Sequence, residues 1–406
     1  MPRLGRITVP ALALASTLAT LDPAGALAQG TARSMDFDVS IRSAGMAGAS
    51  TAVPWGDLDH WANPALLGEA TGIRFVHGRT KLLPELAADM SLTTDVVRAG
   101  AGGFGVVFSG RPFDRGGVLL DYGASQGTDE NGNPTGTFRS FERVRSWGVG
   151  ISVARAIETA FVVAGRTPPA LSRYADVSVG MNWKHLEMSL GPPPFGQAET
   201  DARDRGILGR VTPIDGIDHD APLPLRIDAT YGQSILSYND DAVVRFFNAD
   251  IETPVSRHHR RGGAVRIAAG RAPRGAHAGV FARSLLRGLT PLVSVVASVD
   301  HADIGKHDQT DYHTDGHGFE VTVANILSYR RGHYEDRDGG IDGTTTGWGV
   351  ALPIGEFLGA SYDEARWPQA RFLGFDDLHR RQFSVWIDPL AIRRAMTRPA
   401  DRLAAD

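Results

Sequence analysis

Apolar side chains recur at every second position along most of the chain after about residue 72. In the stretch 147–153, Trp, Val and Ile alternate with Gly and Ser, and the stretches 177–184 and 225–232 alternate in the same way. A period of two places one apolar face and one polar or small face on a β-strand. Helical periodicity is scarce before the C-terminal tail, so we expect an all-β protein.

The same criterion gives about a dozen strand candidates, separated by turn-rich stretches such as 128–136 and 336–343. Besides the three stretches above, the candidates are 73–80, 104–109, 118–124, 264–269, 292–300, 319–324, 348–352, 358–363 and 382–388. Three longer and more charged stretches, 191–224, 237–262 and 300–318, are predicted to be external loops.

The faces opposite the apolar ones carry Gly, Ser, Thr, Asn and scattered charges. This composition suits a crowded or water-filled lumen better than the water-facing surface of a sandwich. A sheet in lipid must close, because an open edge leaves backbone groups unpaired. We therefore expect a transmembrane antiparallel β-barrel of about 14 strands, since bacterial single-chain barrels have even counts. Six aromatic residues are candidates for interfacial girdles, with core packing as the alternative for each Trp: Trp147, Trp183, Tyr231, Trp348, Tyr362 and Trp386.

The N-terminus has the features of a secretory signal peptide over residues 1–28. Arg3 and Arg6 form a basic start, 7–21 is mostly apolar, and 26–28 is an A-x-A cleavage site. The alternative is a short membrane anchor, but the apolar run is shorter than the roughly 20 residues that a spanning helix needs. The chain has no cysteine, which excludes an N-terminal lipid-bearing cysteine, disulfides and thiolate metal sites. The formal net charge of −4 argues against a nucleic-acid partner.

Small residues are concentrated just ahead of the first strand candidate, in the stretch 40–67. The sequence S-A-G-M-A-G-A-S places four of them at Ala44, Gly45, Ala47 and Gly48. Small residues allow one backbone to approach another closely. Farther on, proline at position 64 restricts the preceding residue to an extended or turn conformation. The stretch is therefore predicted to be compact and to pack tightly against another part of the chain.

The order of residues in this stretch resembles the N-terminal signature of the FadL-like outer-membrane barrels, and of the PorV/PorQ subgroup in particular. R-S-A-G-M-A-G-A is followed about fifteen residues later by N-P-A-L-L. The residues that carry the resemblance, and that it implies form a plug or gate motif, are Arg42, Gly45, Met46, Gly48, Ala49, Asn63, Pro64 and Ala65. In those families the segment lies at or inside the barrel mouth, and the chain then enters the first strand.

The C-terminal third extends the resemblance. A Glu-bearing segment at 319–334, a T-x-G-x-G strand at 345–349 and a closing segment at 379–385 have counterparts in PorV/PorQ-type proteins. The middle of the chain, about 110–310, matches only in pattern. The chain also departs from many outer-membrane barrels, which end at an aromatic residue of the last strand, because Asp388-Pro389 and seventeen further residues follow here.

The resemblance implies four parts: a signal peptide (1–28), an N-terminal plug segment (29–71), a transmembrane barrel (72–388) and a short periplasmic tail (389–406). It implies a non-enzymatic protein of the bacterial outer membrane, in contact with its lipid. Passive uptake of hydrophobic small molecules through the barrel is the function expected first. The alternative is a PorV-like partner in protein secretion or surface attachment, which would bind a secreted protein, and a structural barrel without cargo is a third possibility.

The candidate chemical sites are few. His301, His307, His313 and His317 lie among aspartates, and imidazole and carboxylate are metal ligands. Their spacing fits no structural zinc pattern, so we expect a solvated loop and no metal. The stretch 129–140 imitates a calcium loop but lacks its Gly and its final Glu, and is predicted to be a turn. Ser234 follows Gly232-Gln233, as a hydrolase nucleophile could, but without a recognisable partner motif. We therefore expect neither catalysis nor a cofactor.

Overall fold

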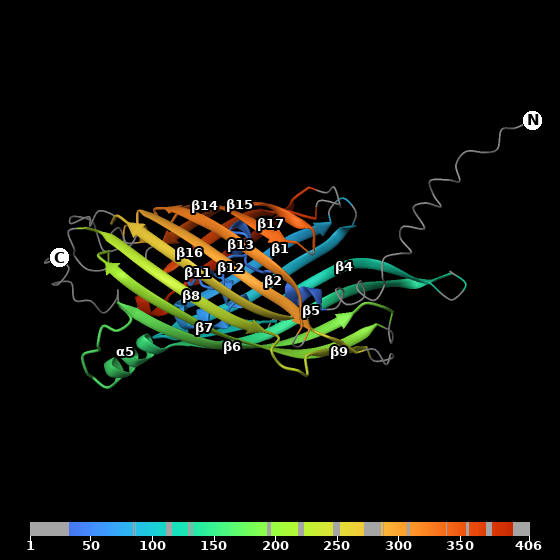
Figure 1. The fold of residues 1–406 in the computed structure, drawn as a ribbon, viewed down its shortest axis with the longest axis horizontal. Coiled ribbons are helices and arrows are strands. Elements are labelled where there is room, and N and C mark those ends of the chain that lie inside the picture. Colours follow the sequence, from blue (N-terminus) through green and yellow to red (C-terminus); the bar gives the residue numbers. More distant parts are fainter. Residues whose placement is uncertain are drawn as a thin grey trace, which may run out of the picture.

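The computed structural model describes residues 32–392 except for 84, 86, 111–115, 129–130, 132, 193–195, 218–222, 247–251, 272–285, 287, 307–308, 338, 355–356 and 371–375. The predicted signal peptide (1–28), most of the predicted tail (389–406) and the start of the calcium-like stretch lie outside the described residues. The described part of the chain is one antiparallel sheet wrapped around an N-terminal segment (Figure 1).

The sheet is closed, because its last strand pairs with its first. Ile73 lies opposite Ile387, and this pairing continues to Thr80 and Arg380. The strands are β1 (Gly72–Leu83), β2 (Ala87–Ala101), β3 (Phe104–Ser109), β4 (Gly117–Thr128), β5 (Pro134–Ser152), β6 (Ala175–Ser189), β7 (Gln197–Asp215), β8 (Leu225–Leu236), β9 (Val243–Phe246), β10 (Glu252–Pro254), β11 (Arg257–Ala269), β12 (Val293–Lys306), β13 (Gln309–Val323), β14 (Leu327–Asp336), β15 (Ile341–Ile354), β16 (Leu358–Trp367) and β17 (Leu378–Ile387).

These seventeen segments occupy fourteen positions in the wall. Strands β3 and β4 share the position between β2 and β5. Strand β9 continues β8 alongside β7, and β10 leads into β11 on the next position. Because three of the seventeen segments share a position with a neighbouring segment, the wall has fourteen strands. All pairs of neighbouring strands are antiparallel. The predicted fold class, an antiparallel β-barrel of about 14 strands with an N-terminal plug-like segment, is confirmed.

The outer wall is apolar, and the inner wall is tightly packed and carries both polar and apolar side chains. On the outer face of β5, Trp147 and Val149 are 47% and 40% exposed, whereas Ser146 on its inner face is buried. Exposed apolar residues recur in the same phase on the other strands, for example Phe75, Phe104, Phe108, Val179, Ile207, Val265, Val299, Phe319 and Trp348. An apolar exterior on a closed sheet is the surface of a transmembrane barrel. Among the described residues, no helix is both long and apolar enough to cross a bilayer.

Most of the predicted aromatic girdle faces outward. Trp147 stacks on Trp183 with ring centroids 4.0 Å apart, and Trp348 contacts Tyr362 at 5.4 Å. The prediction is wrong for Trp386, which faces the lumen, where the guanidinium of Arg74 lies 4.6 Å from its ring centroid. The alternation at the end of β17 places even-numbered residues inside, so an aromatic residue near a strand end can point either way.

The three predicted external loops are largely strand. Strand β7 fills most of 191–224, β11 begins at Arg257, and β12 and β13 cover nearly all of 300–318. In β7, Arg203 and Arg205 are exposed while Asp204 between them is buried. Here the strands extend beyond the apolar band, so both faces carry polar residues and the hydrophobic alternation disappears.

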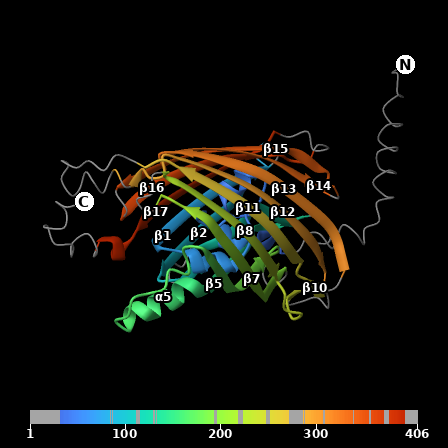
Figure 2. The same cartoon turned by 60° about the vertical axis from the view of Figure 1, so that its left-hand side comes forward.

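One helix was not predicted. Helix α5 (Val153–Val163) follows β5 directly and lies outside the wall, at the end of the barrel where β5 stops (Figures 1 and 2). Val153, Ile157 and Phe161 recur at a spacing of four residues and are all exposed. This is helical periodicity, but it begins where the strand alternation of 147–153 ends, and the two patterns merge in the sequence.

The N-terminal segment, residues 32–70, is buried almost throughout and lies inside the barrel (Figure 2). It contains α3 (Arg33–Asp36), α4 (Ile41–Gly45) and two 3-10 turns, η1 (Asp59–Trp61) and η2 (Pro64–Glu69). The hydroxyl of Ser40 accepts a hydrogen bond from Ser43 N (3.1 Å) and so caps α4. The short helices contact β5, β6, β15 and β16, and thus both sides of the lumen. We call residues 40–67 the internal segment below.

Candidate functional site inside the barrel

A row of glycines on the inner wall makes room for the internal segment. Its members lie on neighbouring strands and pair directly, each with the next: Gly100, Gly105, Gly150, Gly180 and Gly206. A Cβ at Gly105 would lie 1.9 Å from Leu67 O, and one at Gly180 would lie 2.2 Å from Pro64 O. No side chain fits at such distances, so the backbone of η2 rests directly on the backbone of the wall.

The predicted Gly/Ala stretch is fitted to the wall in the same way, farther around the barrel. A Cβ at Gly316 of β13 would lie 2.1 Å from Ala47 O, and one at Gly318 would lie 2.8 Å from Met46 O. Gly48 turns the chain with φ +75°, a conformation that glycine adopts without steric cost. Ala49 is buried against this turn, and Gly45 lies beside Gly347 of β15. The tight packing predicted for this stretch is present.

Asn63 joins three parts of the structure through its side chain. Its Oδ1 accepts a hydrogen bond from Ala65 N (3.0 Å), which caps η2. Its Nδ2 donates to Thr51 O (2.8 Å) and to Ile207 O of β7 (3.1 Å). Pro64 follows at the first position of η2, where a missing N–H leaves no hydrogen bond unmade. Asn63 and Pro64 thus fix where the internal segment touches the wall.

Arg42 binds the internal segment to the opposite wall through a buried ion network. Its Nε and Nη2 donate to the two oxygens of Glu320 on β13 (2.8 and 2.7 Å), and its Nη1 donates to Asp59 (3.2 Å). Arg330 on β14 donates to Glu320 (2.5 Å) and to Asp363 on β16 (2.6 Å). All five residues are at most 8% exposed. Two guanidinium groups therefore hold three carboxylates together across five elements.

Two titratable groups of the internal segment are shifted by their surroundings. Burial raises the pKa of Asp59 to about 6, against the lowering effect of Arg42. Burial lowers the pKa of His60 to about 3, assisted by the positive charges of Arg98 and Lys184. His60 is therefore neutral at ordinary pH. Lys184 is itself paired with Asp204 (2.8 Å) and lies 4.0 Å from the ring centroid of Trp61.

The internal segment separates two cavities of different chemistry. The upper cavity lies towards the end of the barrel where β1 ends at Leu83 and has a volume of ≈ 600 Å³. Its lining is mainly apolar and aromatic, and it also contains three arginines, three aspartates and one histidine. It includes Phe37, Leu82, Met90, Leu92, Leu120, Tyr122, Ala302, Ile304, Tyr312, Tyr334, Trp367 and Leu378.

The lower cavity lies towards the end where β1 begins at Gly72 and has a volume of ≈ 680 Å³. Eight arginines and four carboxylates line it, which leaves four positive charges in excess. The arginines are Arg42, Arg74, Arg98, Arg155, Arg210, Arg226, Arg266 and Arg330. The carboxylate of Glu69 on η2 forms ion pairs with two of them, Arg155 and Arg210, at 2.9 Å each. An apolar chamber and a cationic chamber are thus stacked on either side of the internal segment.

All eight motif residues lie in or beside this partition. Sequence reasoning missed the wall residues that hold it, above all Glu320, Arg330 and Asp363. A signal was present, because Glu320 is a charged residue at the inward position between Phe319 and Val321. Ser234 is structural, as its hydroxyl donates to Ala62 O (2.6 Å). His301, His313 and His317 lie on β12 and β13, so the predicted solvated loop is wrong for them, and His307 lies outside the described residues.

The chain matches no protein-family model and no curated protein. Among solved structures it is similar to the toluene transporter TbuX of Ralstonia pickettii, with 13% identity, 86% of this chain and 98% of that chain covered, and a TM-score of 0.38. The toluene transporter TodX of Pseudomonas putida is 13% identical, with 85% of this chain and 96% of that chain covered and a TM-score of 0.37. A FadL homologue of Pseudomonas aeruginosa is 9% identical, with 86% of this chain and 98% of that chain covered and a TM-score of 0.36. With values this low, what the barrel does has to be argued from its own lumen.

Proposed function

We propose that the protein is a non-enzymatic channel of the bacterial outer membrane for the passive uptake of hydrophobic small molecules. The observation that carries the proposal is the upper cavity, an apolar chamber of ≈ 600 Å³ inside a closed wall. This volume is in the range of small-molecule sites, which are mostly apolar with a few polar groups. The apolar exterior supports a position in a lipid bilayer.

The internal segment is the gate in this proposal. It lies between the two cavities, so a molecule in the upper cavity passes only if part of the segment moves. Asn63 and Pro64 fix the segment on one side and Arg42 fixes it on the other. No energy input is needed, because binding in the upper cavity and release below follow the concentration gradient.

The PorV-like role in protein secretion has no feature of the described residues in its favour. The subgroup suggested by the N-terminal motif remains a prediction.

The first test fills the upper cavity. Ala302 on β12 lines this cavity, and Ala302→Trp places an indole in it. Ala297 lies on the same strand but faces outward, so Ala297→Trp is the matched control. We expect Ala302→Trp to abolish uptake of a hydrophobic tracer by reconstituted vesicles, whereas Ala297→Trp leaves uptake unchanged. Both variants must show the heat-modifiable gel mobility of a folded barrel.

The second test addresses the gate. Replacing Asn63 and Pro64 by alanine should change tracer uptake, because both contacts of the segment with β7 are altered. Unchanged uptake by a correctly folded double variant would refute the gating role. Uptake that is insensitive to Ala302→Trp would refute the channel itself.

A further inference from the structure

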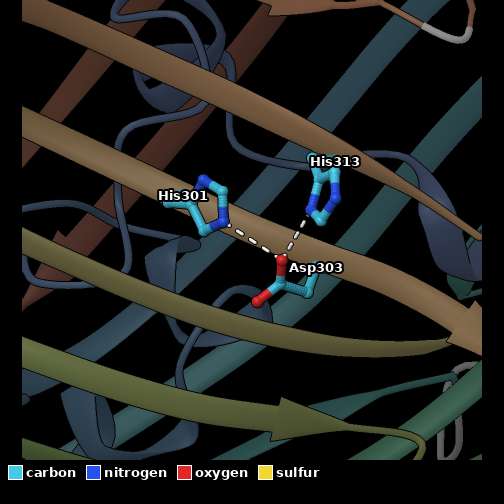
Figure 3. Close-up of side chains that lie close together, drawn as sticks. All are labelled: His301, Asp303 and His313. Atoms are coloured by element: carbon cyan, nitrogen blue, oxygen red, sulfur yellow. Dashed lines mark hydrogen bonds and ion pairs between the residues drawn. The ribbon is translucent and has the colours of Figure 1, made fainter. Parts of the chain in front are cut away.

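Two imidazoles on the outer face of the β12–β13 hairpin converge on one carboxylate oxygen of a third residue, Asp303. His301 Nε2 lies 3.1 Å and His313 Nδ1 lies 2.7 Å from Asp303 Oδ1 (Figure 3). The candidate ligand atoms of the three residues all lie within 4.8 Å of one another. The strand register causes this, because it places Asp303 directly opposite His313 and His301 opposite Asp315. Residues ten to twelve positions apart in the sequence therefore become neighbours on one face.

The second nitrogen of His301 is also occupied. Its Nδ1 lies 2.7 Å from Asp315 Oδ1, and an imidazole nitrogen that faces a carboxylate at this distance donates its N–H. A neutral imidazole has only one N–H, so the lone pair of Nε2 then faces the carboxylate of Asp303. This arrangement needs a cation between the two groups, which is either a proton on Nε2 or a metal ion.

The geometry is close to that of a metal site. Bonds of about 2.0–2.1 Å in a tetrahedral zinc site separate neighbouring ligand atoms by roughly 3.3 Å. The two distances to Asp303 Oδ1 are within about 0.6 Å of this value, so small side-chain rotations admit an ion. Asp315 on the far nitrogen of His301 supplies the outer carboxylate that typically orients a ligating histidine. Two imidazoles and one carboxylate favour zinc and similar transition metals over Ca²⁺ or Mg²⁺, which prefer oxygen ligands.

The three residues are accessible and lie just beyond the apolar band. The side chains of His301, Asp303 and His313 are 28%, 30% and 59% exposed. Val299, two positions before His301 on the same face, is one of the exposed apolar residues of the wall. The inward neighbours Ala302 and Ile304 line the upper cavity. An ion at this place would join β12 to β13 close to their turn and would brace one wall of that cavity.

We propose that His301, Asp303 and His313 form a binding site for a divalent transition-metal ion such as Zn²⁺, with Asp315 as the positioning residue. Three protein ligands leave a fourth position for water in a tetrahedral site. The proposal is independent of the channel function, because the site lies on the outside of the wall and its test measures metal binding alone.

The test uses the full barrel, folded in detergent and stripped of metal. Calorimetric titration with Zn²⁺ is expected to show saturable binding of about one ion per chain, and Co²⁺ is expected to give the visible absorption of a tetrahedral site. His301→Ala, His313→Ala and Asp303→Asn should each weaken binding at least about tenfold, and Asp315→Asn should weaken it by about 10–100-fold. Heat-modifiable mobility shows whether each variant is folded.

Two matched controls separate a built site from ordinary histidine–carboxylate pairs. His185 forms a single histidine–carboxylate pair with Asp201, with Nδ1 and Oδ1 2.9 Å apart, so His185→Ala should leave Zn²⁺ binding unchanged. His317 lies on the same strand as His313 but contacts the ring of His333 instead, so His317→Ala should also have no effect. Absence of saturable Zn²⁺ binding to the folded wild-type barrel would show that the cation on His301 is a proton and would overturn the proposal. Equal binding by the His301→Ala/His313→Ala double variant would overturn it as well.

Discussion

The buried network around Glu320 should control how firmly the internal segment is held. Glu320 accepts two hydrogen bonds from Arg42 and one from Arg330, at 2.5–2.8 Å, and is 6% exposed. Breaking a buried ion pair by removing one partner costs about 3–5 kcal/mol. Arg42 retains Asp59 and Arg330 retains Asp363, so the lower end of this range, about 3 kcal/mol, applies to Glu320→Gln.

A loss of about 3 kcal/mol raises the population of the released segment by roughly 100-fold, since each 1.4 kcal/mol is a factor of about ten. Hydrogen exchange measures this population directly, because amides exchange through local opening. We expect amides of residues 40–50 to exchange about 100-fold faster in Glu320→Gln, while strand amides remain protected.

The matched control is Glu364→Gln. Glu364 lies on β16 and faces His379 and Arg381 at 3.6–3.7 Å on the outer side of the barrel. Exposed pairs of this kind contribute at most about 1 kcal/mol, so the control should leave exchange of the segment unchanged. Equal exchange in the wild type and in folded Glu320→Gln would refute the reasoning, because the network would then not hold the segment.

Three further predictions concern the internal segment. Gly206→Ala places a Cβ 1.9 Å from Asn63 Oδ1 and should displace the segment, and adding Asn63→Ala should restore part of its exchange protection, because the obstructing atom is then gone although the hydrogen bonds of Asn63 are lost as well. Gly180→Ala meets the backbone oxygen of Pro64 at 2.2 Å, so Asn63→Ala should give no rescue in that background. The stability that His60 contributes through its lowered pKa, about 3, is fully present above pH about 6.5 and is lost as the pH falls towards 3, whereas the raised pKa of Asp59, about 6, offsets part of this loss on acidification. Exchange measured over this range should rise on acidification, after correction for intrinsic rates, and His60→Gln should flatten that rise. Persistent burial at pH 4 would contradict this prediction.

The barrel could be predicted from the sequence because lipid imposes a simple rule on it. Alternation such as that of Trp147, Val149 and Ile151 is required wherever one face meets hydrocarbon, and closure follows from the need to pair every edge. The rule lapses where strands leave the apolar band. Arg203, Asp204 and Arg205 are consecutive charged residues in the middle of β7, and no hydrophobic pattern marks them as strand.

Of the candidate site, only the residues of the internal segment could be predicted from the sequence, and the wall residues that hold them could not. Asn63-Pro64 and the Gly/Ala stretch are unusual within the sequence itself. Their partners on the wall are ordinary residues until the strands are aligned. Gly180 is one glycine among 48, and its role depends on lying between Gly150 and Gly206 in the register. Register is a property of pairs of strands, and single-strand patterns do not carry it.

Both sides of the internal segment pack against glycines of the wall, but only one of them also carries the Arg42–Glu320 network. On the side of β3 to β7 it rests on the glycine row, where contact is steric and any added atom collides with backbone or with Asn63. On the side of β13 to β16 it meets Gly316 and Gly318 in the same way, but it is also held by charges, which can exchange one partner for another without a change of shape. Arg42 and Glu320 also line the lower cavity, so a polar group that reaches this cavity can take over one of their bonds. Steric contacts offer no such exchange. If the segment yields to a passing molecule, the charged contacts are therefore the ones that a polar group can replace, and Glu320→Gln should increase uptake where Gly180→Ala disrupts the partition altogether.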